Sequence, residues 1–198
     1  MHEGLLQIYI NSERSMKGTS MRKFTYQALA DIKSTEPQPI FNEQGEHIES
    51  VQRVYDNGLK KLLDGYFDHR YFLKYEVLDK SGQAIFQTKK IFRRGKVWFE
   101  AYDLITNDKY IINYENWRIG VPELFITGTG NQLKMQIDKE MDDWSTFLID
   151  DEVIAKWLAV YDEKSDVFQI TFELSDAAPI QQTAFYIAIA QATLFIGV

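Results

Sequence analysis

The last twenty residues, Pro179 to Val198, constrain the fold more than any other stretch of the chain. They read PIQQTAFYIAIAQATLFIGV, and no charged residue occurs from Ala177 to the end. Alanine favours helix, and proline is well tolerated at the first helical position. We therefore predict a hydrophobic helix over about 179–197 that begins at Pro179, with Ser175 and Asp176 as candidate N-cap residues.

The large apolar residues of this segment are distributed all around the helical circle, so the helix must be buried on every side or lie in a membrane. A membrane span needs ~20 mainly apolar residues. The continuously apolar part, Ala184 to Val198, has 15 residues, and no lysine or arginine flanks it directly. A helix of twenty residues is about 30 Å long, which matches the height of a barrel built from strands of roughly seven to ten residues. This match favours a core helix, with a C-terminal membrane anchor as the alternative.

The rest of the chain is typical of short β-strands joined by polar turns. Apolar and polar residues alternate over 71–78, 132–137 and 167–174, and turn residues such as Asp79–Gly82 separate the segments. A short helical segment is predicted over Leu59–Phe67, with Lys60 and Lys61 exposed. No long helical pattern separates two strands, so parallel βαβ units are not expected. The predicted fold is mainly β: a closed antiparallel β-barrel of about 11–12 strands wrapped around the C-terminal helix.

Four phrases carry a resemblance to a known family: RYFLKYEVLDKSGQAIF (70–86), KKIFRRGKVWFEAYDL (89–104), YENWRIGVPEL (114–124) and the terminal segment. Together they resemble the tubby C-terminal-like superfamily, including tubby-like proteins of Gram-positive bacteria and the LURP-one and phospholipid scramblase relatives. The resemblance implies a barrel around a central helix. Because some tubby-like proteins bind phosphoinositides and scramblase relatives act on phospholipids, it also implies a lipid-binding role. The scramblase cysteine cluster is absent, since the chain has no cysteine.

One basic cluster is the candidate site for an anion or a lipid headgroup. Five basic residues, Lys89, Lys90, Arg93, Arg94 and Lys96, fall within a stretch of eight positions that contains no acidic residue. Lysine and arginine are attracted to anionic membrane surfaces, and a glycine turn exposes backbone N–H groups. The alternative is a solvated hairpin tip whose cations pair with neighbouring acids.

Composition and motifs restrict the function further. The net charge of −7 argues against a nucleic-acid partner, and the chain has neither an evident signal peptide nor a nucleotide-binding or nucleophile-elbow motif. We predict a non-enzymatic binding module without catalytic residues, cofactor or metal site. It would be cytoplasmic and peripheral at the inner face of the membrane, with an anionic phospholipid or membrane surface as partner. The alternative is a protein-interaction or structural domain without lipid affinity, and the oligomeric state stays open.

Residues 1–20 are predicted to be a poorly structured extension, and residues 21–198 a single domain, because regular patterning begins after Met21. Deletion of residues 1–20 should therefore leave the melting temperature unchanged, as measured by circular dichroism on the full-length and shortened chains. A large fall in melting temperature would contradict this domain boundary.

Overall fold

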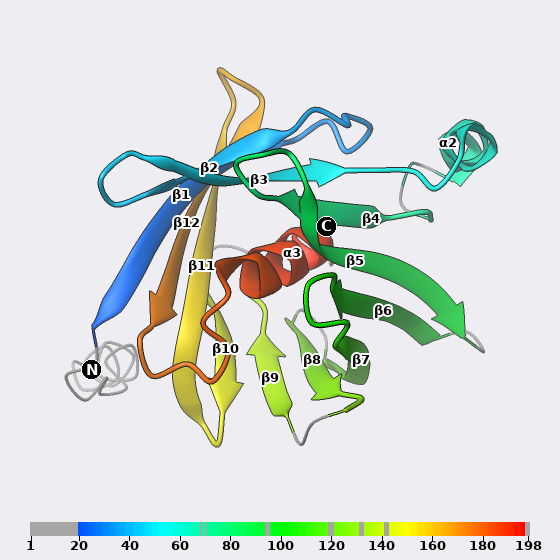
Figure 1. Cartoon of the computed structure of the whole chain (residues 1–198). Coiled ribbons are helices and arrows are strands. Elements are labelled where there is room, and N and C mark those ends of the chain that lie inside the picture. Colours follow the sequence, from blue (N-terminus) through cyan, green and yellow to red (C-terminus); the bar gives the residue numbers. More distant parts are fainter. Residues whose placement is uncertain are drawn as a thin grey trace, which may run out of the picture.

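The computed structural model describes residues 20–67, 69, 71–93, 96–118, 121–130, 133–140 and 143–196. Twelve strands and a C-terminal helix form the domain, with a short helix and a 3-10 turn between the third and fourth strands (Figure 1). The elements are β1 (Met21–Leu29), β2 (Gln38–Asn42), β3 (His47–Arg53), α2 (Gly58–Asp64), η1 (Gly65–Phe67), β4 (Lys74–Leu78), β5 (Ala84–Arg93), β6 (Lys96–Asp103), β7 (Lys109–Arg118), β8 (Val121–Gly128), β9 (Lys134–Asp138), β10 (Ser145–Ile149), β11 (Glu152–Asp162), β12 (Val167–Ser175) and α3 (Thr183–Thr193).

The strands form a closed antiparallel barrel in which each strand pairs with its neighbours in sequence. The pairing of β1 with β12, from Met21 opposite Ser175 to Leu29 opposite Val167, closes the barrel. The predicted fold class and strand number are therefore confirmed. The order of the strands is the simplest one that hairpin connections allow, and it leaves no free sheet edge among the twelve strands.

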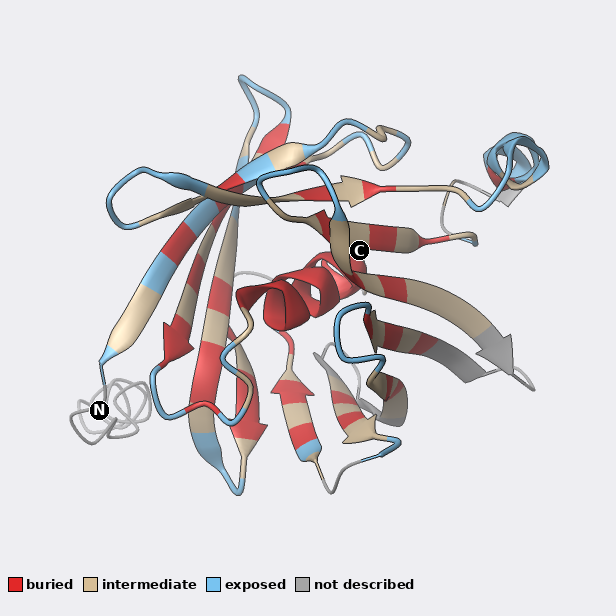
Figure 2. Cartoon of the chain, in the orientation of Figure 1, coloured by how far each residue is buried: buried red, intermediate tan, exposed pale blue. Residues whose placement is uncertain are grey.

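Helix α3 lies inside the barrel, and all eleven of its residues are buried (Figure 2). It packs most extensively against β4 and β5. Phe185 stacks edge-on against Phe86 and Tyr110, with ring centroids 5.6 and 4.9 Å apart, and Tyr186 meets Phe147 at 5.2 Å. These contacts explain why the apolar residues of this helix are distributed around its whole circumference.

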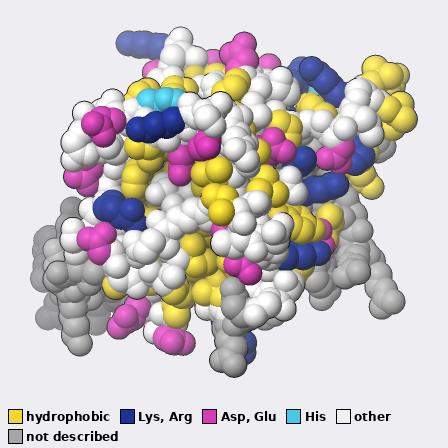
Figure 3. All heavy atoms as spheres, in the orientation of Figure 1, with side chains coloured by type: hydrophobic (Ala, Val, Ile, Leu, Met, Phe, Trp, Pro, Cys, Tyr) yellow, Lys and Arg dark blue, Asp and Glu magenta, His cyan; other side chains and the backbone are white. Residues whose placement is uncertain are grey.

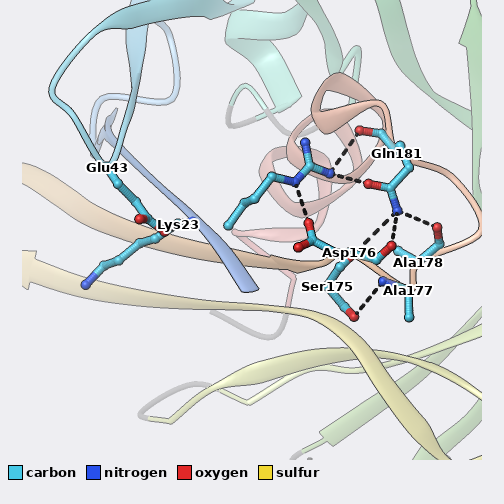
Figure 4. Close-up of polar contacts among 8 residues, drawn as sticks. Lys23, Glu43, Ser175, Asp176, Ala177, Ala178 and Gln181 are labelled. Atoms are coloured by element: carbon cyan, nitrogen blue, oxygen red, sulfur yellow. Dashed lines mark hydrogen bonds and ion pairs between the residues drawn. The ribbon is translucent and has the colours of Figure 1, made fainter. Parts of the chain in front are cut away.

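The helix is shorter than the sequence predicts, and its start is different. It begins at Thr183, after the N-cap Gln182, and Pro179 lies in the connection from β12. The Gln181 side chain donates to the carbonyls of Ala178 (2.6 Å) and Asp176 (3.2 Å), and the Ser175 hydroxyl accepts from the N–H of Ala177 (Figure 4). These bonds hold the connection in an irregular conformation, so neither Ser175 nor Asp176 caps the helix.

Arg22 attaches this connection to the first strand. Its guanidinium lies 3.3 Å from the carboxylate of Asp176 and donates to Gln181. The connection is thereby fixed against β1, beside the closure of the barrel by β12. These contacts direct the chain into the barrel interior.

Glu49 places a carboxylate on the inward face of β3. Its register partner Ile40 and its neighbour Val51 are both buried, and cross-strand partners share a face of the sheet. The Oε2 atom of Glu49 is buried without a hydrogen-bond partner among the described residues. Desolvation raises the pKa of Glu49 from its ordinary 4.5 to about 7.

Ile189→Asp should unfold the domain, because Ile189 is fully buried in the barrel and burial of a new carboxylate there is costly. We expect a loss of several kcal/mol of stability, on the order of that caused by an unpaired buried charge. The measurement is urea denaturation followed by tryptophan fluorescence. Val160→Asp is the control, since Val160 is exposed on β11. Equal stability of the two variants would contradict the core position of α3.

Glu49→Gln should stabilise the protein more above pH 7 than below pH 4.5. The raised pKa of Glu49 means that the folded protein keeps a proton which the unfolded chain releases near pH 4.5. The wild-type protein therefore loses stability as the pH rises from 4.5 through 7, whereas glutamine does not titrate. Melting temperatures across this range test the expectation, with Glu163→Gln in an exposed turn as the control. A parallel pH dependence in the wild type and Glu49→Gln would contradict it.

Candidate anion-binding site

Helix α2 stands out from the barrel beyond β3 and β4 (Figure 1). The Asn57 side chain caps it by accepting from the backbone N–H of Lys60 (2.9 Å). The predicted helical segment over Leu59–Phe67 is thus found as α2 followed by η1. The chain then returns to the barrel as β4, which begins at Lys74.

The carboxylate of Asp56, just before α2, forms ion pairs with lysines from three elements. Lys60 of α2 donates to Asp56 Oδ2, and Lys89 of β5 lies 3.0 Å from the same oxygen. Lys74 of β4 lies 3.5 Å from Asp56 Oδ1 and 3.0 Å from Glu76. Asp56 and these three lysines line a small pocket of about 20 Å³, and Lys90 lines it as well.

Lys74 and Lys89 face each other directly across the β4–β5 ladder. Two like charges at this position repel each other. Asp56 offsets the repulsion, and the hydrogen bonds from Lys60 and Lys89 hold the pKa of Asp56 well below its ordinary value. The carboxylate therefore stays ionised and acts as the common counter-ion of the ammonium groups.

We define the lysine cluster as Lys60, Lys74 and Lys89. These three lysines contact two carboxylates, Asp56 and Glu76, which leaves an excess of one positive charge among the five residues. The whole chain has a net charge of −7, so this excess runs against the overall balance. Figure 3 shows dark-blue Lys and Arg side chains on the side of the molecule where α2 projects.

The cluster contains part of the predicted basic site and adds residues that the sequence did not assign to it. Lys89 belongs to it, with Lys60 from α2 and Lys74 from β4, whereas Lys90, the next residue of β5, lies on the opposite face of the strand. Arg93 pairs with Lys96 across the β5–β6 hairpin, but their side chains, like the whole of Arg94, lie outside the described residues. Arg93 is four residues along β5 from Lys89, or about 13 Å.

A second cavity, of about 30 Å³, opens at the end of the barrel near Arg53, Tyr75 and Gln191. It has room for about two water molecules. Tyr75 of β4 and Gln191 of α3 line this cavity together, and burial raises the pKa of Tyr75 to about 12. Within the described ranges, no three His, Asp or Glu side chains are placed to hold a metal ion.

A closed antiparallel barrel that encloses an apolar C-terminal helix defines the class of protein. The model of the Tubby C-terminal-like domain family matches residues 24–196, and the chain belongs to this family. The predicted resemblance is therefore confirmed. Neither curated proteins nor solved structures provide a match.

Family membership indicates a binding module. In the part of the chain that the structure describes, every helix is too short or too polar to cross a membrane. The apolar segment predicted as a core helix or a membrane anchor is found inside the barrel as α3.

Proposed function

We propose that the protein is a non-enzymatic module that binds anionic phospholipid headgroups at a membrane surface through the lysine cluster. The observation that carries the proposal is the convergence of Lys60, Lys74 and Lys89 on one carboxylate. Ammonium groups bind phosphate oxygens as point charges, and each lysine near an anionic surface contributes about 1 kcal/mol.

Asp56 holds the lysine side chains close together in the absence of a bound anion. A single carboxylate leaves each ammonium with further donors free to point outward, because an ammonium has three N–H groups. The side chains of Lys60 and Lys89 are 32% and 38% exposed, so these donors are accessible from solvent. A headgroup phosphate would share the lysines with Asp56 at the rim of the pocket. Arg93, Arg94 and Lys96, which follow Lys89 in the sequence, are proposed to extend the same basic surface.

Flotation with phosphatidylcholine vesicles, alone or mixed with phosphatidylserine, tests this function. The wild-type protein should bind only the anionic vesicles, and less so at physiological salt. Lys60→Ala/Lys89→Ala should weaken binding by about 2 kcal/mol, or roughly thirtyfold, at low salt. Asp56→Asn should strengthen it, because the ammonium groups lose their internal counter-ion.

The matched control is Lys80→Ala/Lys164→Ala, which removes the same charge from two exposed hairpin turns away from α2. Arg93→Ala/Arg94→Ala/Lys96→Ala tests the extension of the surface separately. If the control and Lys60→Ala/Lys89→Ala lost vesicle binding equally, net charge alone would explain the loss. That result would contradict a defined binding site. Failure of the wild-type protein to bind any vesicle would refute the lipid function and direct the search to protein partners.

A further inference from the structure

Helix α2 is oriented opposite to an ordinary surface helix, which buries its apolar face. Its buried residue is the acid Asp64, with no exposed surface. Its large apolar residues point outward instead: Leu59 is 65% exposed, Leu62 is 67% exposed, and Tyr66 of η1 is 81% exposed. The pale-blue surface of α2 in Figure 2 coincides with yellow side chains at the same projection in Figure 3.

A polar anchor fixes this orientation. The buried guanidinium of Arg53 donates to Asp64, and the hydroxyl of Tyr55 donates to the same carboxylate (2.9 Å). The other Asp64 oxygen accepts from the backbone N–H of Phe72 (2.9 Å). Breaking a buried ion pair is costly, so rotating α2 to bury its leucines would cost more than the exposed leucines do. The exposed apolar face is therefore a stable property of the fold.

The apolar face adjoins the lysine cluster. Lys60 and Lys61 lie on α2 between Leu59 and Leu62, and Lys60 reaches Asp56 at the pocket. An exposed apolar face beside cations is the combination by which a helix lies in the interface of an anionic bilayer. Tyrosine, here Tyr66 and the exposed Tyr71, prefers the same interface. A convex projection of this kind fits a deformable lipid surface, which needs no matching groove.

We propose that α2 inserts Leu59, Leu62 and Tyr66 into the interfacial layer of an anionic bilayer while the lysine cluster contacts the headgroups. The apolar side chains would enter to a depth of about 5–10 Å. The inference rests on the proposed function, because the same surface supplies the cations. It adds an apolar contribution to binding that salt does not screen.

A cysteine label reports insertion directly, since the chain contains no cysteine. Leu62→Cys and the control Val160→Cys each receive an NBD fluorophore in the full chain. Val160 is also an exposed apolar residue, but it lies on β11, five strands from β4 around the barrel. With vesicles of phosphatidylcholine and phosphatidylserine, the label at 62 should shift to the blue and be quenched by nitroxide lipids. The label at 160 should do neither.

Leu59→Ser/Leu62→Ser should reduce vesicle binding by about tenfold while its salt dependence persists, because the lost contribution is apolar. Val160→Ser should leave binding unchanged, and circular dichroism would confirm that each variant is folded.

Three other outcomes would overturn the inference. Flotation of the wild-type protein without any change in the label at 62 would refute insertion but keep the headgroup function. Absence of flotation would refute both. A blue shift without vesicles that grows with protein concentration would assign the face to a second copy of the chain.

Discussion

The burial of α3 is the constraint on which the rest of the structure depends. This helix has no polar face for solvent, so it needs apolar contacts around its whole circumference, and a closed barrel provides them. Small alanines at 184, 188, 190 and 192 let the strands approach, and Phe185 and Tyr186 fill the wider parts of the interior. Two hydroxyl groups are satisfied locally: the Thr193 hydroxyl donates to the carbonyl of Ile189 (2.9 Å), and Thr88 of β5 donates to that of Ala188 (3.2 Å). The hydroxyl of Tyr186 and the Oε1 atom of Gln191 are buried without a hydrogen-bond partner among the described residues. The barrel and its helix are therefore parts of one core, and neither is complete alone.

A second constraint acts at the edge of that core. Arg53 ends β3 with its guanidinium buried, and a buried charge needs a partner. Asp64, at the end of α2, is this partner. The same carboxylate accepts a hydrogen bond from the backbone N–H of Phe72, so β4 begins only at Lys74. One ion pair thus positions both chain segments that carry Lys60 and Lys74. The placement of the lysine cluster follows from a buried interaction outside the cluster itself.

Much of the fold is predictable from the sequence because it depends on local patterns. Alternation along β9 and β12, and turn residues such as Asp79–Gly82, locate strands that pair with their neighbours, and hairpin connections account for the strand order. The start of α3 is not predictable in this way: Pro179 satisfies the local rules, but hydrogen bonds from Gln181 hold the preceding segment irregular. The site is only partly predictable. The spacing of Asp56 and Lys60 is a readable i,i+4 pair, whereas the approach of Lys74 and Lys89 depends on strand register. The leucines of α2 would ordinarily be expected on a buried face, but the hydrogen bonds of Asp64 with Arg53, Tyr55 and Phe72 turn them outward.

The acidic balance of the chain is compatible with a basic binding surface. At physiological ionic strength, charges farther apart than about 8 Å are largely screened. At contact, an anionic surface would therefore respond to the local excess around Lys60 and Lys89 more than to the net charge of −7. Before contact, the acidic groups of the chain would be repelled by the same surface, so approach with α2 forward would be favoured. In the proposed function, the acidic remainder of the barrel would then orient the module, and the lysine cluster would retain it.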